Sequence, residues 1–191
     1  MWRMNSSHSN LTDWGLEHIS IANHDTILDV GCGGGRTVNK LAAIAKQGKV
    51  YGVDHSEESI AFAKKTNAHW IEADRVEIRQ ASVSQLPFPD NTFNVITAVE
   101  THYFWPDLPA DVHEVLRVLK PGGTFVLIAE VYKGANTTAA RLLEKYPELI
   151  GMTLLTTEEH RELLANAGYS NVEVAEQRAN GWLCAAGTKP I

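Results

Sequence analysis

Short apolar runs rich in β-branched residues alternate with amphipathic segments along most of the chain. Helical periodicity appears near residues 36–46, 56–67 and 107–119. Strand–helix alternation of this kind predicts βαβ units and a mostly parallel sheet. The near-continuous apolar runs FNVITAV and FVLIA are typical of strands covered on both faces. We expect strands at residues 26–30, 49–53, 76–80, 93–98 and 124–131.

The last third of the chain begins with a helical pattern near residues 137–146. Thr156 and Glu159 then form a T-x-x-E capping box. It predicts a helix that runs to about Ala167, where Gly168 ends it.

Two further apolar runs, at residues 172–177 and 182–186, flank Asn180-Gly181. This pair is favoured in two-residue hairpin turns. We therefore expect an α/β fold with a doubly wound, Rossmann-like sheet of seven mostly parallel strands. The sheet would end in a C-terminal antiparallel hairpin, with helices on both faces.

The segment before the first strand, LTDWGLEHISI at residues 11–21, resembles an amphipathic helix with Leu11, Trp14 and His18 near one face. We expect residues 1–24 to form a helical cap and residues 25–191 to form the main domain. We find no internal repeat or linker in the sequence.

Composition narrows the function classes. The chain has 191 residues, a net charge of −6 and a pI near 5.7. Lys and Arg do not cluster, which argues against a nucleic-acid partner. No apolar run approaches the length of a membrane span, and the polar start lacks a signal-peptide pattern. We expect a cytoplasmic protein, monomeric or homodimeric, that does not engage a membrane.

Cys32 and Cys184 have no CxxC spacing, and the eight His residues are scattered. A disulfide framework or a metal site is therefore not expected. We interpret both cysteines as small buried residues.

The stretch ILDVGCGGGRTV, residues 27–38, carries the clearest chemical signal. Its glycines follow the first predicted strand and lead into a helix. Glycine permits positive φ and the close approach of a ligand to bare backbone. The helix N-terminus adds free N–H groups and a positive dipole end. The stretch therefore predicts a nucleotide-like cofactor site at the carboxyl ends of the strands.

The spacing of the glycines restricts the ligand. A P-loop would need a Lys-Ser or Lys-Thr pair, which is absent from this stretch. The dinucleotide pattern G-x-G-x-x-G fails in both frames, because Arg36 or Val38 stands at its last position. What remains is D-x-G-x-G-x-G, formed by Asp29, Gly31, Gly33 and Gly35. The leading carboxylate would repel a pyrophosphate and attract a cation such as an α-ammonium group.

Asp54 ends the predicted strand KVYGVD, 19 positions after Gly35 (54 − 35). A carboxylate at the tip of the second strand can accept both hydroxyls of a ribose. Beside the glycine loop, this role is favoured over that of an ordinary surface aspartate.

These motifs together resemble class I S-adenosylmethionine-dependent methyltransferases, of the small ubiquinone/menaquinone type. The similarity covers roughly residues 27–128 and continues more weakly through Val174. ILDVGCGGG matches the family's first motif and GVDHSEESIAFAKK its second. QASVSQLPFPDNTFNVITAVE and HEVLRVLKPGGTFVLI match the segments through strands four and five, and TTEEHRELLANAGYSNVEV matches the late helix and sixth strand.

The resemblance implies S-adenosylmethionine as the cofactor and assigns its contacts. Around the methionine and ribose it implies Gly31, Cys32 and Gly33, with Asp29 facing the amino group. Val99 is a further implied cofactor contact. Asp54 would hold the ribose hydroxyls. Around the adenine it implies His55, Ser82 and the backbone N–H of Val83. Ser82 replaces a frequent Asp and would make a weaker contact. Lys120-Pro121-Gly122-Gly123 is interpreted as a structural turn before the fifth strand.

The loop after the fourth strand is the predicted substrate side. Glu100, His102 and Tyr103 all offer acid–base or hydrogen-bonding chemistry, and an imidazole titrates near neutral pH. His102 is thus either a general base or a loop residue that satisfies the backbone. Trp14 and His18 either form a lid over the substrate or, in the case of Trp14, anchor the helix to the core.

The favoured activity is methyl transfer to a small molecule. The alternatives are methylation of RNA or protein, and a protein that binds S-adenosylmethionine without transferring its methyl group. An NAD-dependent oxidoreductase is disfavoured by Arg36 in the loop.

Overall fold

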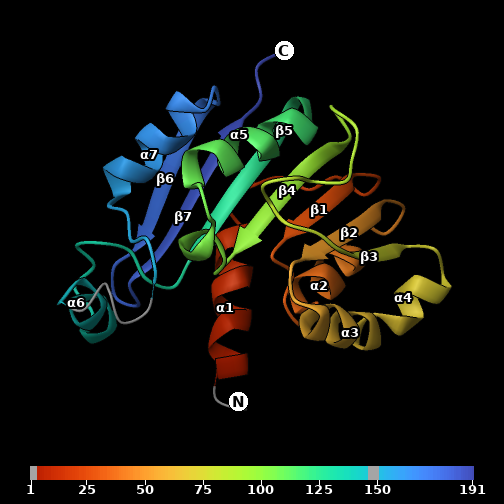
Figure 1. Ribbon diagram of the computed structural model, residues 1–191, viewed down its shortest axis with the longest axis horizontal. Helices are drawn as coiled ribbons and strands as arrows, with labels where there is room; N and C mark the ends of the chain where they lie inside the picture. The colour runs from red at the N-terminus through yellow and green to blue at the C-terminus, as the bar shows by residue number, and fades with distance from the viewer. Residues whose placement is uncertain (1–3, 146–150) are drawn as a thin grey trace.

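The described residues form one seven-stranded sheet in the order β3-β2-β1-β4-β5-β7-β6 (Figure 1). The computed structural model describes the backbone of residues 4–145 and 151–191, with side chains from residue 9 onward in those ranges. β1 to β5 are parallel, and β7 pairs antiparallel with β5 and β6, which confirms the expected fold. The strands are β1 (Thr26–Val30), β2 (Lys49–Asp54), β3 (Val76–Gln80), β4 (Phe93–Val99), β5 (Leu119–Ala129), β6 (Ser170–Gln177) and β7 (Trp182–Thr188).

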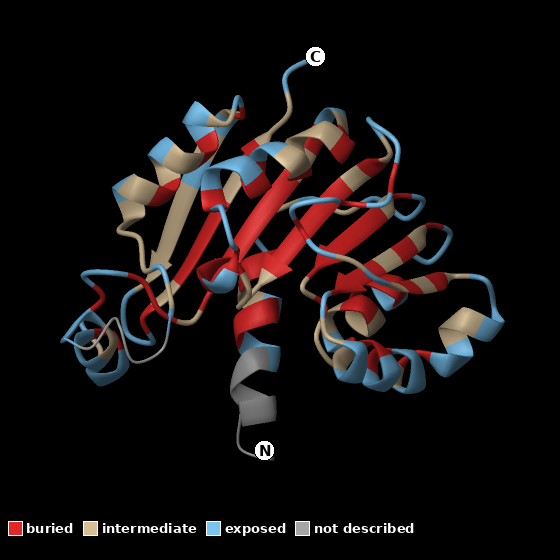
Figure 2. Cartoon of the chain, viewed as in Figure 1, coloured by how far each residue is buried: buried red, intermediate tan, exposed pale blue. Residues whose placement is uncertain are grey.

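Helices cover both faces of this sheet, and alternate residues of each central strand pack on opposite sides. In β5, Phe125 and Leu127 belong to one buried cluster, while Val126 and Ile128 belong to the other. The first cluster packs against α5 and α7, and the second against α1, α2 and α3. Figure 2 shows that burial concentrates on the central strands. The helices are α1 (Met4–Leu16), α2 (Arg36–Ile44), α3 (Glu57–Thr66), α4 (Ala68–Glu72), η1 (His102–Phe104), α5 (Leu108–Val118), α6 (Thr138–Lys145) and α7 (Thr157–Asn166).

The strand order creates a switch point beside β1. The chain proceeds from β1 to β2 on one side, and β4 pairs with β1 on the other. In open parallel sheets, ligands bind in the crevice at such a point, outside the carboxyl ends of the strands. The glycine loop after β1, the end of β2 and the loop after β4 all begin at this edge.

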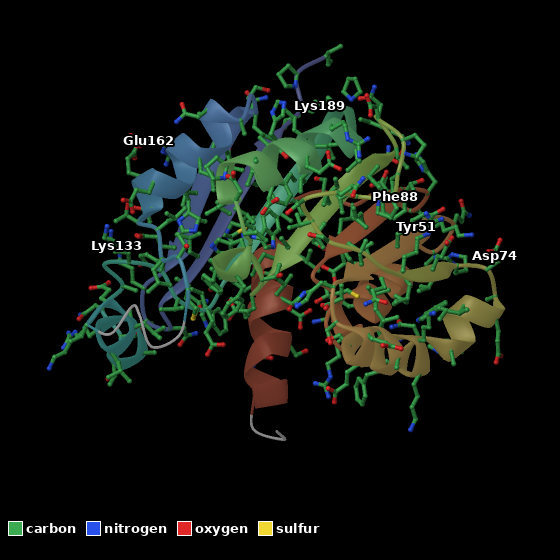
Figure 3. The ribbon with its side chains drawn as sticks, viewed as in Figure 1. Tyr51, Asp74, Phe88, Lys133, Glu162 and Lys189 are labelled. Atoms are coloured by element: carbon green, nitrogen blue, oxygen red, sulfur yellow. The ribbon has the colours of Figure 1, made fainter. Side chains whose placement is uncertain are left out.

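The segment that follows β3 is held against the sheet by aromatic packing. Phe88 packs edge to face on Tyr51 of β2, with ring centroids 5.5 Å apart (Figure 3). Phe88 also meets Phe93 at 4.9 Å. These contacts hold Phe88 against the sheet, in the segment that also contains Ser82 and Val83.

The Lys120-Pro121-Gly122-Gly123 element differs from the expected turn before the strand, because it lies inside β5. The pairing of β4 with β5 jumps from Phe93–Leu119 to Val95–Thr124, so these residues bulge out of the ladder. Gly122 adopts a φ of 76°, which glycine supplies at low cost. The role remains structural, but the element is a bulge.

The N-terminal helix also differs from its predicted range, since α1 ends at Leu16 and residues 17–21 are not helical. Gly15 packs directly on β5, because an added Cβ would lie 2.4 Å from Cδ1 of Ile128. The helix thus anchors to the sheet near its C-terminal end. The division at residue 24 into cap and domain stays a prediction. Within the described residues, no helix has the length and apolar character that crossing a membrane requires.

Candidate functional site

The glycine loop is tied to the end of β2 by its own backbone. The N–H groups of Gly31 and Cys32 both donate to the carbonyl of Val53, at 2.8 and 2.9 Å. Gly31 and Gly33 adopt φ values of 71° and 49°. A Cβ on Gly31 would lie 2.1 Å from Oγ1 of Thr101, whereas a Cβ on Gly33 would meet nothing within 4 Å. Gly31 is therefore needed for packing, and Gly33 leaves open space at the loop surface.

The last glycine of the dinucleotide pattern, which lets a helix pack closely on the sheet, is absent from this loop. Gly52 of the neighbouring strand β2 has the same packing role. A Cβ on Gly52 of β2 would come within 2.8 Å of Cγ2 of Val38 and within 3.1 Å of Sγ of Cys32. The close approach of α2 to the sheet is thus provided by a strand glycine. Gly35 serves a second helix contact, because its Cβ would lie 2.9 Å from Cα of Ala63 in α3.

Asp54 lies at the end of β2 with a nearly buried carboxylate. Its Oδ2 accepts the N–H of Gly33 at 2.9 Å, and its Oδ1 accepts the N–H of Ser56 at 2.9 Å. Each carboxylate oxygen has a second lone pair. Both oxygens can therefore accept a further hydrogen bond from a diol while they hold the loop in place.

Asp29 is a buried acid at the wall of the site. Its Oδ1 accepts the hydroxyl of Thr97 at 2.6 Å. Burial raises the pKa of Asp29 to about 7, the Thr97 hydrogen bond opposes this rise, and the nearby charge of Asp54 adds to it. A cation bound beside Asp29 would offset the cost of ionising it in this environment.

Two cavities flank the glycine loop. One, of about 450 Å³, is lined by the residues predicted for the adenosine end, Asp54, His55, Ser82 and Val83. The other, of about 730 Å³, is lined by those predicted for the methionine end, Asp29, Cys32 and Gly33, and by Val99. Gly31 and Glu100 line both cavities. The structure therefore brings all the predicted cofactor residues to a groove formed by two cavities that meet at Gly31 and Glu100.

The adenine end of the groove is shaped by short polar contacts. Oγ of Ser82 accepts the N–H of Ser84 at 3.2 Å, and Val83 is buried beside it. The imidazole of His55 is 88% exposed and lies 3.7 Å from Oδ1 of Asp54. A planar ring can lie against this imidazole without displacing any buried side chain.

These features fit S-adenosylmethionine. The open space at Gly33 admits a ligand against the loop backbone, and one carboxylate lies on each side of it. Asp54 offers its remaining lone pairs to a ribose, and Asp29 offers a negative charge to an α-ammonium group. A pyrophosphate would meet two carboxylates and would be repelled.

Glu100 lies where the two cavities meet, just after β4. Its φ is 59°, an uncommon left-handed backbone for a residue other than glycine. Its Oε1 accepts the hydroxyl of Tyr103 at 3.0 Å and also the N–H of Glu130. Burial raises the pKa of Glu100 to about 7, and these two hydrogen bonds limit the rise.

His102 lies away from the groove. It is fully buried and is not among the described residues that line either cavity. Its Nε2 lies 3.2 Å from Nε2 of His160, whose Nδ1 lies 2.7 Å from the carbonyl of Thr156. Burial, together with His160, holds the pKa of His102 well below its usual value. This placement favours the structural alternative for His102 over a general base.

Trp14 packs on the core and on His18, which is exposed, and neither is among the described residues that line the cavities. Their rings are 4.7 Å apart, and Trp14 also meets Trp182 of β7 at 5.9 Å. Trp14 therefore anchors α1. The residues of α1 that line the larger cavity are instead Ser9 and Thr12.

Sequence reasoning missed several lining residues. Lys40 of α2 lines the larger cavity. Its ammonium donates to Oγ of Ser9 at 3.3 Å and forms an ion pair with Asp13 at 2.5 Å, so it links α2 to α1 beside this cavity. Phe62 of α3 lines the same cavity with 60% of its surface exposed. The spacing of Ser9 and Thr12 by three positions is the signal that places them on one helical face.

Comparisons with known proteins agree with this geometry. The family described as "Methyltransferase domain" matches residues 28–127. O-methyltransferase cnsE of Penicillium expansum is 28% identical over 85% of this chain and 58% of its own. A demethylmenaquinone methyltransferase of Symbiobacterium thermophilum is 38% identical over 54% of this chain and 42% of its own. The chain thus spans about half the length of these curated relatives.

The fold is similar to that of a chain in the complex between the Haloferax volcanii Trm112 methyltransferase activator and a putative methyltransferase. The TM-score is 0.83, with 23% identity over 98% of this chain and 92% of that chain. At this identity, the likeness concerns the fold.

Proposed function

The chain belongs to the methyltransferase domain family of class I S-adenosylmethionine-dependent enzymes, and we propose that it transfers a methyl group from this cofactor to a small-molecule acceptor. One observation carries the proposal. A carboxylate suited to a ribose and another suited to an ammonium group lie on either side of the glycine loop, in cavities that meet at Gly31 and Glu100.

The cofactor would lie across this loop, and when bound it supplies an activated methyl group on a sulfonium. Asp54 would orient the ribose through the oxygens that already hold Gly33 and Ser56. Asp29 would fix the ammonium group. His55, Ser82 and Val83 would enclose the adenine. These contacts leave the groove at Glu100 for the reacting atoms.

A small acceptor is supported by the size of the larger cavity and by the helix beside it. Its volume is about 730 Å³, and α1 borders it through Ser9 and Thr12. Held between α1 and the loop, an acceptor would be oriented toward the methyl group and shielded from water. The relatives named as an O-methyltransferase and a demethylmenaquinone methyltransferase support the same class.

The test is transfer of an isotope-labelled methyl group from S-adenosylmethionine to a metabolite extract, with mass identification of the product. We expect a labelled small molecule with the native chain. Label recovered only in RNA or protein would favour a macromolecular acceptor. Cofactor binding without any labelled product would favour the non-catalytic alternative.

Asp54→Asn provides the paired variant and Asp74→Asn the matched control. Asp74 is an exposed acid with a φ of 55°, which asparagine tolerates. Transfer should fall in the first variant and persist in the second. A cytoplasmic location and a monomeric or homodimeric state stay predictions.

A further inference from the structure

We propose that Glu100 accepts a proton from the methyl acceptor at Oε2, so that the acceptor presents a hydroxyl or an amine N–H. This inference rests on the proposed methyl transfer and specifies its acceptor class. It also separates the roles of two neighbouring residues, because Tyr103 would position Glu100 without touching the acceptor.

The position of Glu100 is the first support. Its side chain lines both cavities, at the place where a methyl group joined to both halves of the cofactor would lie. The left-handed backbone at Glu100, with a φ of 59°, is fixed by its N–H, which donates to the carbonyl of Ile128 at 2.9 Å. Strain of this kind at a cavity wall is typical of functional residues.

The hydrogen bonds of Glu100 distinguish its two oxygens. Both the Tyr103 hydroxyl and the Glu130 N–H donate to Oε1. Neither hydrogen bond uses Oε2, and among the described residues Oε2 is not one of the buried side-chain atoms that lack a partner. This oxygen can therefore meet a ligand in the groove. The carboxylate is thus held by one oxygen and presented by the other.

The acidity of Glu100 suits proton transfer near neutral pH. Burial raises its pKa to about 7, and the charge of Glu130 adds to the rise while the hydrogen bonds to Oε1 oppose it. A general base is most effective when its pKa lies close to the working pH. An ordinary glutamate, with a pKa near 4.3, would be a much weaker base.

Tyr103 is a donor to Glu100. Its side chain is buried, and its hydroxyl lies 3.4 Å from the N–H of Val131 as well as 3.0 Å from Oε1. Burial and the charge of Glu100 raise the pKa of Tyr103 well above its usual value. The phenol therefore keeps its proton and cannot serve as the base.

The proposed step balances in atoms and charge. The acceptor oxygen or nitrogen bonds to the methyl carbon, the electron pair of the C–S bond stays on sulfur, and the acceptor proton moves to Oε2. Glu100 later releases this proton to solvent. A thiolate or an activated carbon would need no such base, and an anionic acceptor would be repelled by the ionised Glu100.

Glu100→Gln separates a base from a structural role. The glutamine carbonyl can still accept from Tyr103 and from the Glu130 N–H, but the amide cannot take a proton. At pH 7 and saturating cofactor, we expect turnover to fall by about 10²–10⁴-fold. Affinity for S-adenosylhomocysteine, measured by calorimetry, should change less than about threefold.

Tyr103→Phe tests the positioning role, and Glu77→Gln is the control on the surface of β3. Loss of the Tyr103 hydrogen bond should move the acidic limb of the pH–rate profile upward, while Glu100→Gln should abolish that limb. Carbon NMR of labelled glutamate carboxyls gives a readout without turnover. One resonance should titrate near 7 in the native chain, at higher pH in Tyr103→Phe, and should be missing in Glu100→Gln.

The assay uses labelled S-adenosylmethionine and metabolite extract, and NMR of the product identifies the methylated atom. Methyl on oxygen or nitrogen, with the expected loss in Glu100→Gln, supports the inference. Methyl on carbon or sulfur, or a Glu100→Gln rate within about twofold of native, overturns it and leaves the proposed transfer intact. No labelled product overturns the proposed transfer, and this inference with it.

Discussion

The backbone N–H of Gly33 donates to Oδ2 of Asp54 at 2.9 Å. The carboxylate proposed to bind the ribose therefore also fixes the loop on which the cofactor would lie. The second oxygen of Asp54 holds the N–H of Ser56, which begins the next helical segment. Binding and loop conformation depend on the same side chain.

Asp54→Ala should weaken binding of S-adenosylmethionine by about 1.5–3 kcal/mol, since charged hydrogen bonds are lost. It should also lower the unfolding temperature, because two backbone N–H groups lose their acceptor. Calorimetry and thermal unfolding measure the two effects, with Asp74→Asn as the control. Unchanged affinity would remove Asp54 from the site.

Gly33→Ala should mainly lose cofactor binding, whereas Gly31→Ala should mainly lose stability. The Cβ at position 33 would project into open space, so binding should be lost with a modest stability cost of about 1 kcal/mol for the positive φ. The Cβ at position 31 would collide with Thr101, so stability should fall further. Urea unfolding and calorimetry separate the two. Normal binding by Gly33→Ala would mean that the ligand does not approach this backbone.

Cofactor affinity should depend on pH through Asp29. Its pKa is raised to about 7, so it must lose a proton to pair with an ammonium group. Affinity should rise by about fivefold between pH 6 and 7, as Asp29 becomes half ionised. Above pH 7 it should rise by less than twofold, since the cofactor amine itself titrates near 7.7–8.0. Asp29→Asn should flatten this dependence, whereas Glu100→Gln should retain most of it. A steep dependence that survives in Asp29→Asn would contradict the role of Asp29.

The His102–His160 pair should make the fold sensitive to acid. Burial lowers the pKa of both imidazoles in the folded chain. The unfolded chain therefore binds more protons below pH 6.5, and stability falls as pH drops through that value. Each histidine that stays neutral in the folded chain adds to this loss of stability as the pH falls below 6.5.

His102→Gln can still donate to His160 but does not titrate. Urea unfolding at pH 7.5 and 5.5 should show a smaller loss of stability in this variant than in the native chain. Asp29 and Glu100 act in the opposite direction, since their raised pKa values favour the folded state at low pH. Both acids are present in the native chain and in His102→Gln, so their effect cancels in the comparison. An equal acid loss in both proteins would show that His102 titrates normally.

Local patterns were sufficient to predict the sheet and to place Asp54 at the end of β2, while the cofactor contacts stay predictions. The strands follow from continuous apolar runs, and Asp54 from its distance to the glycines, because both signals lie within short segments. The bulge at residues 120–123 could not be predicted, since it depends on the register with β4. The burial of His102 depends on His160, which lies 58 positions later in the chain.

The N-terminal helix illustrates the same limit. Its first turns, MNSSHSN, are polar and carry no apolar period, so the predicted range began at Leu11. The observed range starts at Met4, which brings Ser9 to the cavity. The sequence leaves Trp14 either a lid residue or an anchor of the helix, and its packing on Trp182 depends on the last strand of the sheet.

The most direct test of the central claim is a calorimetric titration of the native chain with S-adenosylhomocysteine and, separately, with NADH. We expect one binding site for S-adenosylhomocysteine, with weaker affinity in Asp54→Ala, and no heat of binding for NADH. Tight binding of NADH without binding of S-adenosylhomocysteine would contradict it.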